Sequence, residues 1–270
     1  MPRSIATPDS VPEDIAEALA GAGTRLGPFE GRLSWHEEVP STNDLAAVMA
    51  EHGAAEGCVV AANTQTSGRG RLGRSWASPP GAGLYVSAIL RPARDVIPLI
   101  TIAAGVAVAD GVQAASGLSP RVKWPNDVYV GPRKLAGILA EAGGSGGGVQ
   151  HVILGFGINL LTAAYPPDIA ARATSVENEL GRRCDRGLVL AECLAALADR
   201  YQALQRGEAD TVTSAWRERA ADNLGRIVEW DADGVTRRGV ALDIDSRGAL
   251  LVRVDGAIIR VISGEVRWVS

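Results

Sequence analysis

At 270 residues, 46% of them hydrophobic, the chain is long enough for one large domain, or for one large and one small domain, around an apolar core. Its formal net charge of −4 at pH 7 argues against a general nucleic-acid binder. No apolar run reaches the roughly 20 uncharged residues that a membrane span needs, and no basic stretch leads into an apolar one at the start, so we expect neither a membrane segment nor a secretion signal.

The first predicted helix follows Ser10 and Glu13, which have the spacing of a capping box, and it ends near Gly21. The first strand is predicted at residues 32–39. Only about 30 residues precede it, which is too few for a helix-turn-helix domain with its own core. We therefore expect no specific DNA binding.

Further elements follow at short intervals. Ser41 is predicted to cap a helix that ends near His52. Residues 97–115 are apolar and rich in small residues at helical spacing, which predicts a buried helix. The remaining strands of this part are predicted at residues 57–63, 84–90, 122–124, 128–130, 135–141 and 149–161, and two more helices at 188–205 and 209–222.

The pattern changes at about residue 224. Short strands separated by turns rich in Asp and Gly predict a small all-β unit of the barrel type, with strands at residues 227–230, 239–244, 250–254 and 258–261. Such a unit is too small to be very stable alone, so we expect it to pack on the main domain. The predicted fold class is α+β: a main domain over residues 1–223 with a mixed or antiparallel sheet, then a β-domain over residues 224–270.

Cysteine and histidine are too sparse for a disulfide framework or a metal centre. The three cysteines are an odd number without CxxC spacing, which predicts reduced, buried thiols in a cytoplasmic protein: Cys58, Cys184 and Cys193. The three histidines are scattered, with no two at metal-ligand spacing: His36, His52 and His151. We therefore expect no transition metal held by protein ligands.

A polar loop after the second strand carries the strongest chemical signal. Glycines alternate with arginines in it, and a tryptophan ends it: Gly68, Arg69, Gly70, Arg71, Arg74 and Trp76. The glycines let the backbone approach a ligand, the arginines supply forked donors for carboxylate or phosphate, and the indole offers a flat face to a ring such as adenine. Because three arginines repel one another without an anion between them, we expect the loop to order around its ligand. A solvated loop, or an Arg-Gly segment that binds nucleic acid, is an equal alternative.

Only two of the 27 basic residues are lysines, Lys123 and Lys134, and they lie close together in the sequence. Arginine does not replace lysine where a compact ammonium must face a phosphate or a reacting carbonyl. Lys123, Asn126 and Asp127 stand at a proline-fixed strand end, which predicts contacts with a nucleotide and its Mg²⁺; a β-turn closed by Asn-Asp is the alternative. Lys134 opens an apolar strand, where it either points into a site or extends along the surface to solvent.

Gly155 and Gly157, followed by Asn159, end the last strand of the main domain. They do not form a dinucleotide fingerprint, because Leu160 stands where a third glycine is needed and no helix pattern follows. Glycines here let a ligand pass over the strand. A strand end with a bulge is the alternative.

Taken in order, these segments resemble the biotin–protein ligase family, in its short form without a DNA-binding domain. The resemblance rests on five motifs in one order: Ser41-Thr42-Asn43, and residues 65–76, 123–127, 133–139 and 155–159. It covers residues 35–160 closely and the rest in architecture only. Ser67 stands where alanine is common in the family, a departure that matters little.

The resemblance implies a catalytic domain like that of class II aminoacyl-tRNA synthetases, followed by an SH3-like β-barrel. It implies two steps: biotin and MgATP give biotinyl-5′-AMP and pyrophosphate, and a carrier lysine then attacks the mixed anhydride. The implied partner is the biotin carboxyl carrier domain of acyl-CoA or pyruvate carboxylases. A cytoplasmic monomer or weak homodimer is implied, with no membrane contact and no metal besides the Mg²⁺ carried by ATP.

The resemblance also assigns roles to residues. It implies biotin contacts for Ser41, Thr42, Asn43, Gln65, Gly68, Arg69, Gly70, Arg71, Lys134, Gly155 and Gly157, and ATP contacts for Arg71, Arg74, Trp76, Lys123, Asn126 and Asn159. Lys134 and Arg69 are the implied catalytic residues: Lys134 would neutralise charge on the α-phosphorus and the acyl oxygen, and Arg69 with Arg71 would hold the carboxylate and then the phosphate. Adenylation needs no protein nucleophile, which agrees with the lack of a Ser/His/Asp or Cys/His constellation.

Two alternative functions follow from the same residues. A lipoate or octanoate ligase or transferase shares the implied fold, and the Gly-Arg-Gly-Arg loop with the Lys-Trp-Pro-Asn-Asp motif favours biotin over it. A nucleic-acid-binding module built on the Arg-Gly loop belongs to another class, and the net charge of −4 argues against it.

Overall fold

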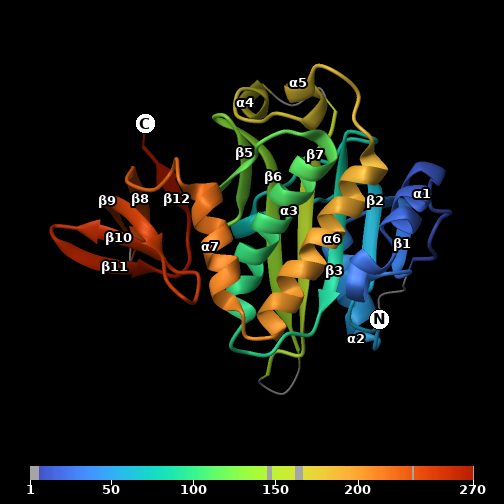
Figure 1. Cartoon of the computed structure of the whole chain (residues 1–270), viewed down its shortest axis with the longest axis horizontal. Helices are drawn as coiled ribbons and strands as arrows, with labels where there is room; N and C mark the ends of the chain where they lie inside the picture. The colour runs from blue at the N-terminus through green and yellow to red at the C-terminus, as the bar shows by residue number, and fades with distance from the viewer. Residues whose placement is uncertain (1–5, 145–147, 162–166, 233, 270) are drawn as a thin grey trace.

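A seven-stranded mixed sheet forms the centre of the larger domain in this computed structural model, which describes residues 6–144, 148–161, 167–232 and 234–269 (Figure 1). Its strands follow the order β1-β2-β3-β7-β6-β5-β4. The neighbours β1 and β2 are parallel, and the other neighbouring pairs are antiparallel. The bounds are β1 Leu33–Val39, β2 Val59–Gln65, β3 Gly83–Leu90, β4 Arg121–Lys123, β5 Asp127–Val130, β6 Arg133–Gly143 and β7 His151–Asn159. The predicted strands and the mixed sheet are confirmed.

Helices cover both faces of this sheet. They are α1 Glu13–Ala22, α2 Thr42–Glu51, α3 Ile100–Ser116, α6 Arg186–Gln205 and α7 Ala209–Ala220, with two short helices, α4 Pro167–Ala170 and α5 Val176–Leu180. α3 and α6 pack against each other over one face, with α7 beside them (Figure 1). α2 covers part of the other face, where its Leu45 shares a smaller apolar cluster with Ile89 and Ile153 of the sheet. Because β3 is covered from both sides, all of its residues are buried and apolar or small.

The helix α3 is apolar over most of its length because it lies largely inside the main core. Gly111 allows its close approach to α6: a Cβ at this position would lie 2.5 Å from the backbone of Cys193. By length and composition the segment Ile97–Ser116 would also suit a membrane span, but 67% of its apolar window is buried inside the structure. The predicted buried helix is thereby confirmed as a core helix.

The start of α1 differs from the prediction. Pro12 occupies the position before the first helical residue, and no side chain caps the helix there. Asp9 pairs with Trp35 at the edge of β1, so the chain is still extended three residues before Pro12. The predicted capping box of Ser10 and Glu13 is therefore wrong, and the fixed φ of proline starts the helix instead.

The cysteines are free, as predicted, but only one of them is buried. Cys193 lies in the core, whereas Cys58 and Cys184 are half-buried. Burial raises the pKa of the Cys184 thiol to about 11, and the nearby Glu177 carboxylate acts in the same direction. The described part of the chain also holds no group of three or more His, Cys, Asp or Glu side chains placed to bind a metal ion.

The C-terminal residues form a second sheet, which is five-stranded and antiparallel, in the order β11-β10-β9-β8-β12. Its strands are β8 Ile227–Ala232, β9 Val235–Ile244, β10 Leu250–Val254, β11 Ala257–Val261 and β12 Val266–Trp268. Four of these were predicted, and β12 was not, because three residues give no readable alternation. The edge strands β11 and β12 are not paired with each other within the residues described, so closure into an SH3-like barrel stays a prediction.

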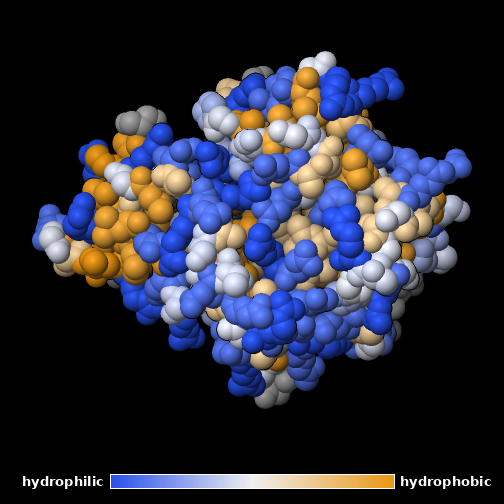
Figure 2. All heavy atoms as spheres, viewed as in Figure 1, coloured by the Kyte–Doolittle hydropathy of each residue, from blue (hydrophilic) through white to orange (hydrophobic). Residues whose placement is uncertain are grey.

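The second sheet packs on the main domain, as expected. The indole N–H of Trp124 donates to Gly248 O at 2.9 Å, and Arg217 of α7 donates to Asp243 at 2.7 Å. The main apolar core continues without a break from one sheet into the other. Figure 2 shows apolar residues gathered over this domain, where Val235 and Ile258 are 60% and 62% exposed.

Candidate active site

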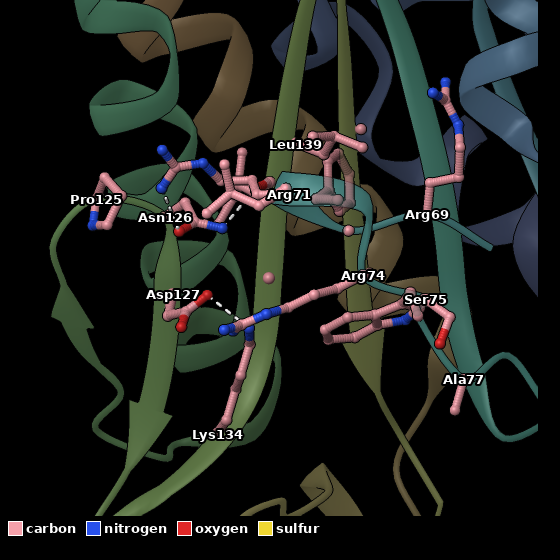
Figure 3. A pocket seen from close by; sticks show the side chains of 18 of the residues that line it. Arg69, Arg71, Arg74, Ser75, Ala77, Pro125, Asn126, Asp127, Lys134 and Leu139 are labelled. Carbon is pink, nitrogen blue, oxygen red and sulfur yellow. Dashed lines mark hydrogen bonds and ion pairs between the residues drawn. The ribbon is translucent and has the colours of Figure 1, made fainter. Parts of the chain in front are cut away.

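A cavity of about 820 Å³ lies on the α2 side of the large sheet, away from α3 and α6. Its wall includes the start of α2, the loop after β2, the turn between β4 and β5, parts of β3, β5, β6 and β7, residues 169–173, and the residues around β12. Every residue that the resemblance assigns to biotin or ATP lines this cavity, except Gly68. Figure 3 shows how Arg71, Asn126, Asp127 and Lys134 face one another across it.

Gly68 belongs to the loop but does not line the cavity. Its carbonyl accepts the N–H of Trp76 at 2.8 Å. A Cβ at this position would lie 2.5 Å from Trp76 O and 2.8 Å from Ser78 Oγ. Glycine is required here because the loop folds back on itself, and the contact of Gly68 with biotin stays a prediction.

Polar side chains, most of them buried, form one end of the cavity. Ser41 caps α2 by accepting the N–H of Asp44 at 3.4 Å. In the first turn, Thr42 donates to Gln65 Oε1 from its N at 2.9 Å and from its Oγ1 at 3.1 Å. Ser41, Thr42 and Asn43 are each no more than 4% exposed. Because unpaired polar groups are costly to bury, such a wall suits a ligand that is itself polar at this end.

The loop between β2 and β3 closes on itself at its tip. The N–H of Gly70 donates to Arg74 O at 2.7 Å, and a short 3-10 turn (Arg71–Gly73) lies between them. Leu72 in this turn has a φ of 56° and is 69% exposed. The turn places the side chains of Arg71 and Arg74 over the cavity (Figure 3).

Arg69 points away from the other cationic residues of the loop (Figure 3). Its Nη1 and Nη2 donate to the two carboxylate oxygens of Glu141 at 2.9 and 2.7 Å. Its Nη2 also lies 2.7 Å from Asp44 Oδ1. This two-pronged pair fixes the guanidinium, so the protein itself already holds the group that was predicted to bind the biotin carboxylate.

The other two arginines of the loop also have partners within the protein. Arg71 donates to Asn126 Oδ1 at 3.1 Å, and Arg74 forms an ion pair with Glu265 of the second domain. Burial lowers the pKa of Arg71, while the carboxylates of Asp127 and Glu265 act in the opposite direction. The expectation that only a ligand anion offsets the repulsion between these arginines is therefore wrong.

Lys134 points into the cavity from the start of β6 (Figure 3). Its Nζ lies 2.6 Å from Asp127 Oδ1 and 5.3 Å from the centre of the Trp76 ring. Its side chain is 29% exposed. Of the two interpretations open for this lysine, the structure supports a cation held inside a site rather than one that extends along the surface.

Glycines in β6 and β7 make room for the Trp76 ring and the Asn43 amide, which line the cavity. A Cβ at Gly157 would lie 2.5 Å from Trp76 Nε1, and one at Gly137 would lie 2.9 Å from the same indole. A Cβ at Gly155 would lie 2.1 Å from Asn43 Oδ1. Gly155 and Gly157 line the cavity as predicted, and their immediate neighbours are protein side chains.

Lys123 lies between two aromatic rings, one from each domain. Its Nζ is 4.4 Å from the centre of the Tyr129 ring and 6.0 Å from that of Trp268. Burial lowers the pKa of Lys123, and Asp127 partly opposes this effect. Burial, with help from the same carboxylate, raises the pKa of Tyr129 to about 12. Lys123 therefore joins the two domains at the cavity wall.

The two asparagines predicted for ATP also hold the backbone in place. Asn126 Nδ2 donates to Ile138 O at 2.9 Å, and Ile138 N donates to Asn126 O at 2.8 Å. Asn159 Nδ2 donates to Thr174 O at 3.0 Å. Both side chains line the cavity, but the Nδ2 of each already donates to a backbone carbonyl. Fewer of their polar atoms therefore remain for a ligand.

Some residues at this site were not found from the sequence, among them Glu141, Glu265 and Trp268. Glu141 is the single acidic residue of β6, in a run that is otherwise apolar from Leu135 onward, a signal that could have singled it out. Glu265 and Trp268 belong to the segment around the unpredicted β12, and no local pattern connects that segment to the main domain.

The comparisons with known proteins agree with this geometry. Residues 35–159 match the family model of the biotin/lipoate A/B protein ligase family, and residues 224–267 match that of the biotin protein ligase C-terminal domain. The biotin--[acetyl-CoA-carboxylase] ligase of Mycobacterium tuberculosis is 33% identical over 260 residues, which cover 93% of each chain. The bifunctional ligase/repressor BirA of Bacillus subtilis is 32% identical over 259 residues, covering 94% of this chain and 79% of that protein.

A solved structure also resembles this one throughout. The biotin protein ligase from Aquifex aeolicus in complex with biotin and ATP has a TM-score of 0.74 and 27% identity, covering 88% of this chain and 98% of that one. The family matches, the relatives and the shared fold agree with one another. The chain therefore belongs to the biotin protein ligases of the biotin/lipoate A/B protein ligase family.

Proposed function

We propose that the protein is an ATP-dependent biotin protein ligase, which forms biotinyl-5′-AMP and then transfers biotin to a lysine of a biotin carboxyl carrier domain. One observation carries the proposal. A single cavity has a wall of buried hydrogen-bonding groups at one end and the cations Lys134 and Arg71 at the other. Biotin is a cyclic urea at one end and a carboxylate at the other. The Mycobacterium tuberculosis relative and the Aquifex aeolicus structure are named as biotin ligases, which supports biotin over lipoate as the substrate.

In the first step the biotin carboxylate attacks the α-phosphorus of ATP. A bond forms between the carboxylate oxygen and phosphorus, and the bond to pyrophosphate breaks. Negative charge builds on the α-phosphate oxygens, and Lys134 and Arg71 are the cations placed to stabilise it. The carboxylate is already ionised at neutral pH, so no side chain needs to act as nucleophile or base in this step.

In the second step the carrier lysine attacks the acyl carbon of the anhydride, and AMP leaves. Arg71 stays in reach of the phosphate, because Asn126 anchors it at the cavity wall. Arg69 was predicted to be catalytic together with Lys134. Its engagement by Glu141 supports a different assignment, in which Arg69 holds the loop and Arg71 faces the reacting groups.

The nucleotide occupies the side of the cavity next to the second domain in this proposal. Trp76, Lys123 and Arg74 face this side, and Asn126 and Asn159 border it. Mg²⁺ enters with ATP and offsets the charge of its phosphates. The residues present fit such a cation, because Asp127 offers carboxylate oxygens at the cavity wall, where its Oδ1 lies 2.6 Å from Lys134 Nζ.

The finer features of the proposal concern organisation and partners. We assign residues 1–223 to the catalytic domain and residues 224–270 to the C-terminal domain, which agrees with a family match that begins at residue 224. The partner is the biotin carboxyl carrier domain of an acyl-CoA or pyruvate carboxylase. The enzyme acts in the cytoplasm as a monomer or weak homodimer, without specific DNA binding.

Incubation with biotin, MgATP and a biotin carboxyl carrier domain tests the proposal. We expect the intact mass of the carrier to rise by one biotinyl group, and replacement of the carrier's acceptor lysine by arginine to prevent the change. Lipoate in place of biotin is the matched comparison. An unmodified carrier with biotin, or equal modification with lipoate, would contradict the proposal.

A further inference from the structure

The buried end of the cavity is connected to Glu141, the carboxylate that also binds Arg69. Glu141 extends from β6, and its Oε2 accepts a hydrogen bond from Asn43 Nδ2 at 2.7 Å. Asn43 Oδ1 lies 2.6 Å from Ser87 Oγ, which in turn lies 2.8 Å from Thr42 Oγ1. Ser87 is fully buried in β3. A continuous hydrogen-bonded chain thus runs from Glu141 to Thr42, a residue of the proposed biotin site.

The charge of Glu141 fixes the direction of every bond in this chain. A carboxylate only accepts, so Asn43 must turn its Nδ2 toward Glu141 and its Oδ1 toward Ser87. Because Oδ1 also only accepts, the single hydroxyl proton of Ser87 is donated to Asn43. Ser87 then has no proton to give to Thr42. The hydroxyl proton of Thr42 is directed to Ser87 or to Gln65 Oε1 at 3.1 Å, and both lie within the protein.

The outcome is that Thr42 Oγ1 presents lone pairs, and not a proton, to the cavity. Donation along a chain that ends in a carboxylate also strengthens each oxygen as an acceptor. A cyclic urea carries N–H groups on both sides of its carbonyl, so it needs acceptors at its edge. With the amide of Asn43 reversed, Ser87 could donate to Thr42 and would occupy one of these lone pairs.

We propose that Glu141 is a positioning residue for substrate recognition. Through Asn43 and Ser87 it keeps the hydroxyl of Thr42 as an acceptor for an N–H of the ureido ring. This inference rests on the proposed function and deepens it. The same carboxylate also binds Arg69, but Asp44 lies 2.7 Å from that guanidinium as well. The loop therefore keeps one carboxylate when Glu141 is replaced, and the two roles of Glu141 are separable.

The first test replaces Glu141 with its neutral isostere, Glu141→Gln, in the full-length protein. Biotin affinity is measured by titration calorimetry without ATP, and biotin-dependent pyrophosphate exchange gives KM and kcat. We expect the Kd and KM for biotin to rise about tenfold, as for a mismatched hydrogen bond in a buried site. The kcat at saturating biotin and the KM for ATP should stay within about twofold of wild type. Unchanged biotin affinity in Glu141→Gln would overturn the inference.

A matched control separates the effect on Asn43 from an effect on the loop. Asp44→Asn removes the other carboxylate next to Arg69 and leaves Asn43 its bond to Glu141. We expect this variant to bind biotin within about twofold of wild type. If Asp44→Asn weakened biotin binding as much as Glu141→Gln does, Glu141 would act through the loop and the inference would be wrong.

A second variant tests the connection itself. Ser87→Ala removes the hydroxyl that relays the direction from Asn43 to Thr42, so adding Glu141→Gln to this variant should change the Kd for biotin by less than about twofold. The two changes act on one chain, so the double variant should be no weaker than the weaker single variant. Independent, multiplying effects would contradict a shared chain. A wild-type protein inactive with biotin would instead refute the proposed function.

Discussion

At the scale of single residues, Lys134 carries the electrostatic part of the proposed chemistry. Its ammonium is fixed by Asp127 at 2.6 Å and lies over the Trp76 ring. A cation that is already in place where charge develops needs no reorganisation during the reaction. Arginine offers the same charge, but its planar fork is longer and would not fit between a carboxylate and an indole in the same way.

Lys134→Arg should therefore lower the rate of biotin-dependent pyrophosphate exchange by about a hundredfold, the scale of a lost transition-state contact. The neighbouring Arg133 supplies a control, because its guanidinium pairs with Glu179 at 2.7 Å and does not line the cavity. Arg133→Lys should stay within about twofold of wild type. A near-normal rate for Lys134→Arg would show that this lysine is not needed for adenylation.

Gly157 is a second residue where a small change should have a large effect. Its added Cβ would lie 2.5 Å from Trp76 Nε1, so the half-buried indole would have to shift. Overpacking of this kind costs about 1–3 kcal/mol, so Gly157→Ala should raise the KM for ATP about tenfold or more. Gly21→Ala is the control, because nothing lies within 4 Å of its Cβ. Equal ATP affinity in both variants would contradict the packing role of Gly157.

At the scale of elements, the arginine loop is connected to the second domain through Arg74 and Glu265. The two side chains are 65% and 39% exposed, so the pair contributes at most about 1 kcal/mol to folding. The hydrogen bond from Arg74 holds the pKa of Glu265 below its ordinary value of 4.5. A carboxyl with a lowered pKa stabilises the fold above its ordinary pKa, and this stabilisation is lost as the pH falls through the lowered value.

Glu265→Gln should consequently reduce the free energy of unfolding by up to about 1 kcal/mol at pH 7. The difference from wild type should shrink toward zero as the pH falls below 4.5, because the wild-type carboxyl then becomes protonated as well. Urea unfolding at pH 7, 5 and 3 measures this difference. A difference that stays constant with pH would rule out an ionic contribution from the pair.

The same elements show which features local sequence can predict. The cap of α2 at Ser41 and the apolar strands follow from short-range patterns, and the structure confirms them. Glu141 reaches Asn43 and Arg69 across 98 and 72 residues, and no local pattern encodes such contacts. The predicted site residues other than Gly68 line one cavity, whereas the direction in which Arg69 points was not predicted. Short elements such as α5 and β12 were missed because they are below the length at which periodicity is readable.

At the scale of the whole molecule, the cavity is completed by both domains. Trp268 of β12 lines it and faces Lys123, and Gly248 accepts the indole N–H of Trp124. The C-terminal domain therefore belongs to the wall of the proposed ATP site and is not a separate appendage.

Trp268→Ala should raise the KM for ATP about tenfold and leave the KM for biotin within about twofold, because the ring lies at the nucleotide side. Deletion of residues 224–270 should impair pyrophosphate exchange and transfer to the carrier more severely, since it also opens the shared apolar core. Steady-state kinetics of both proteins test this. Wild-type rates from a soluble truncated protein would show that the second domain is dispensable.

Pyrophosphate exchange into ATP, measured with the wild-type protein and no carrier present, tests the central claim most directly. Formation of biotinyl-5′-AMP is reversible, so labelled pyrophosphate should appear in ATP only when biotin is added, and lipoate should support little exchange. Exchange that is absent with biotin, or as fast with lipoate as with biotin, would contradict the assignment of this cavity to biotin adenylation.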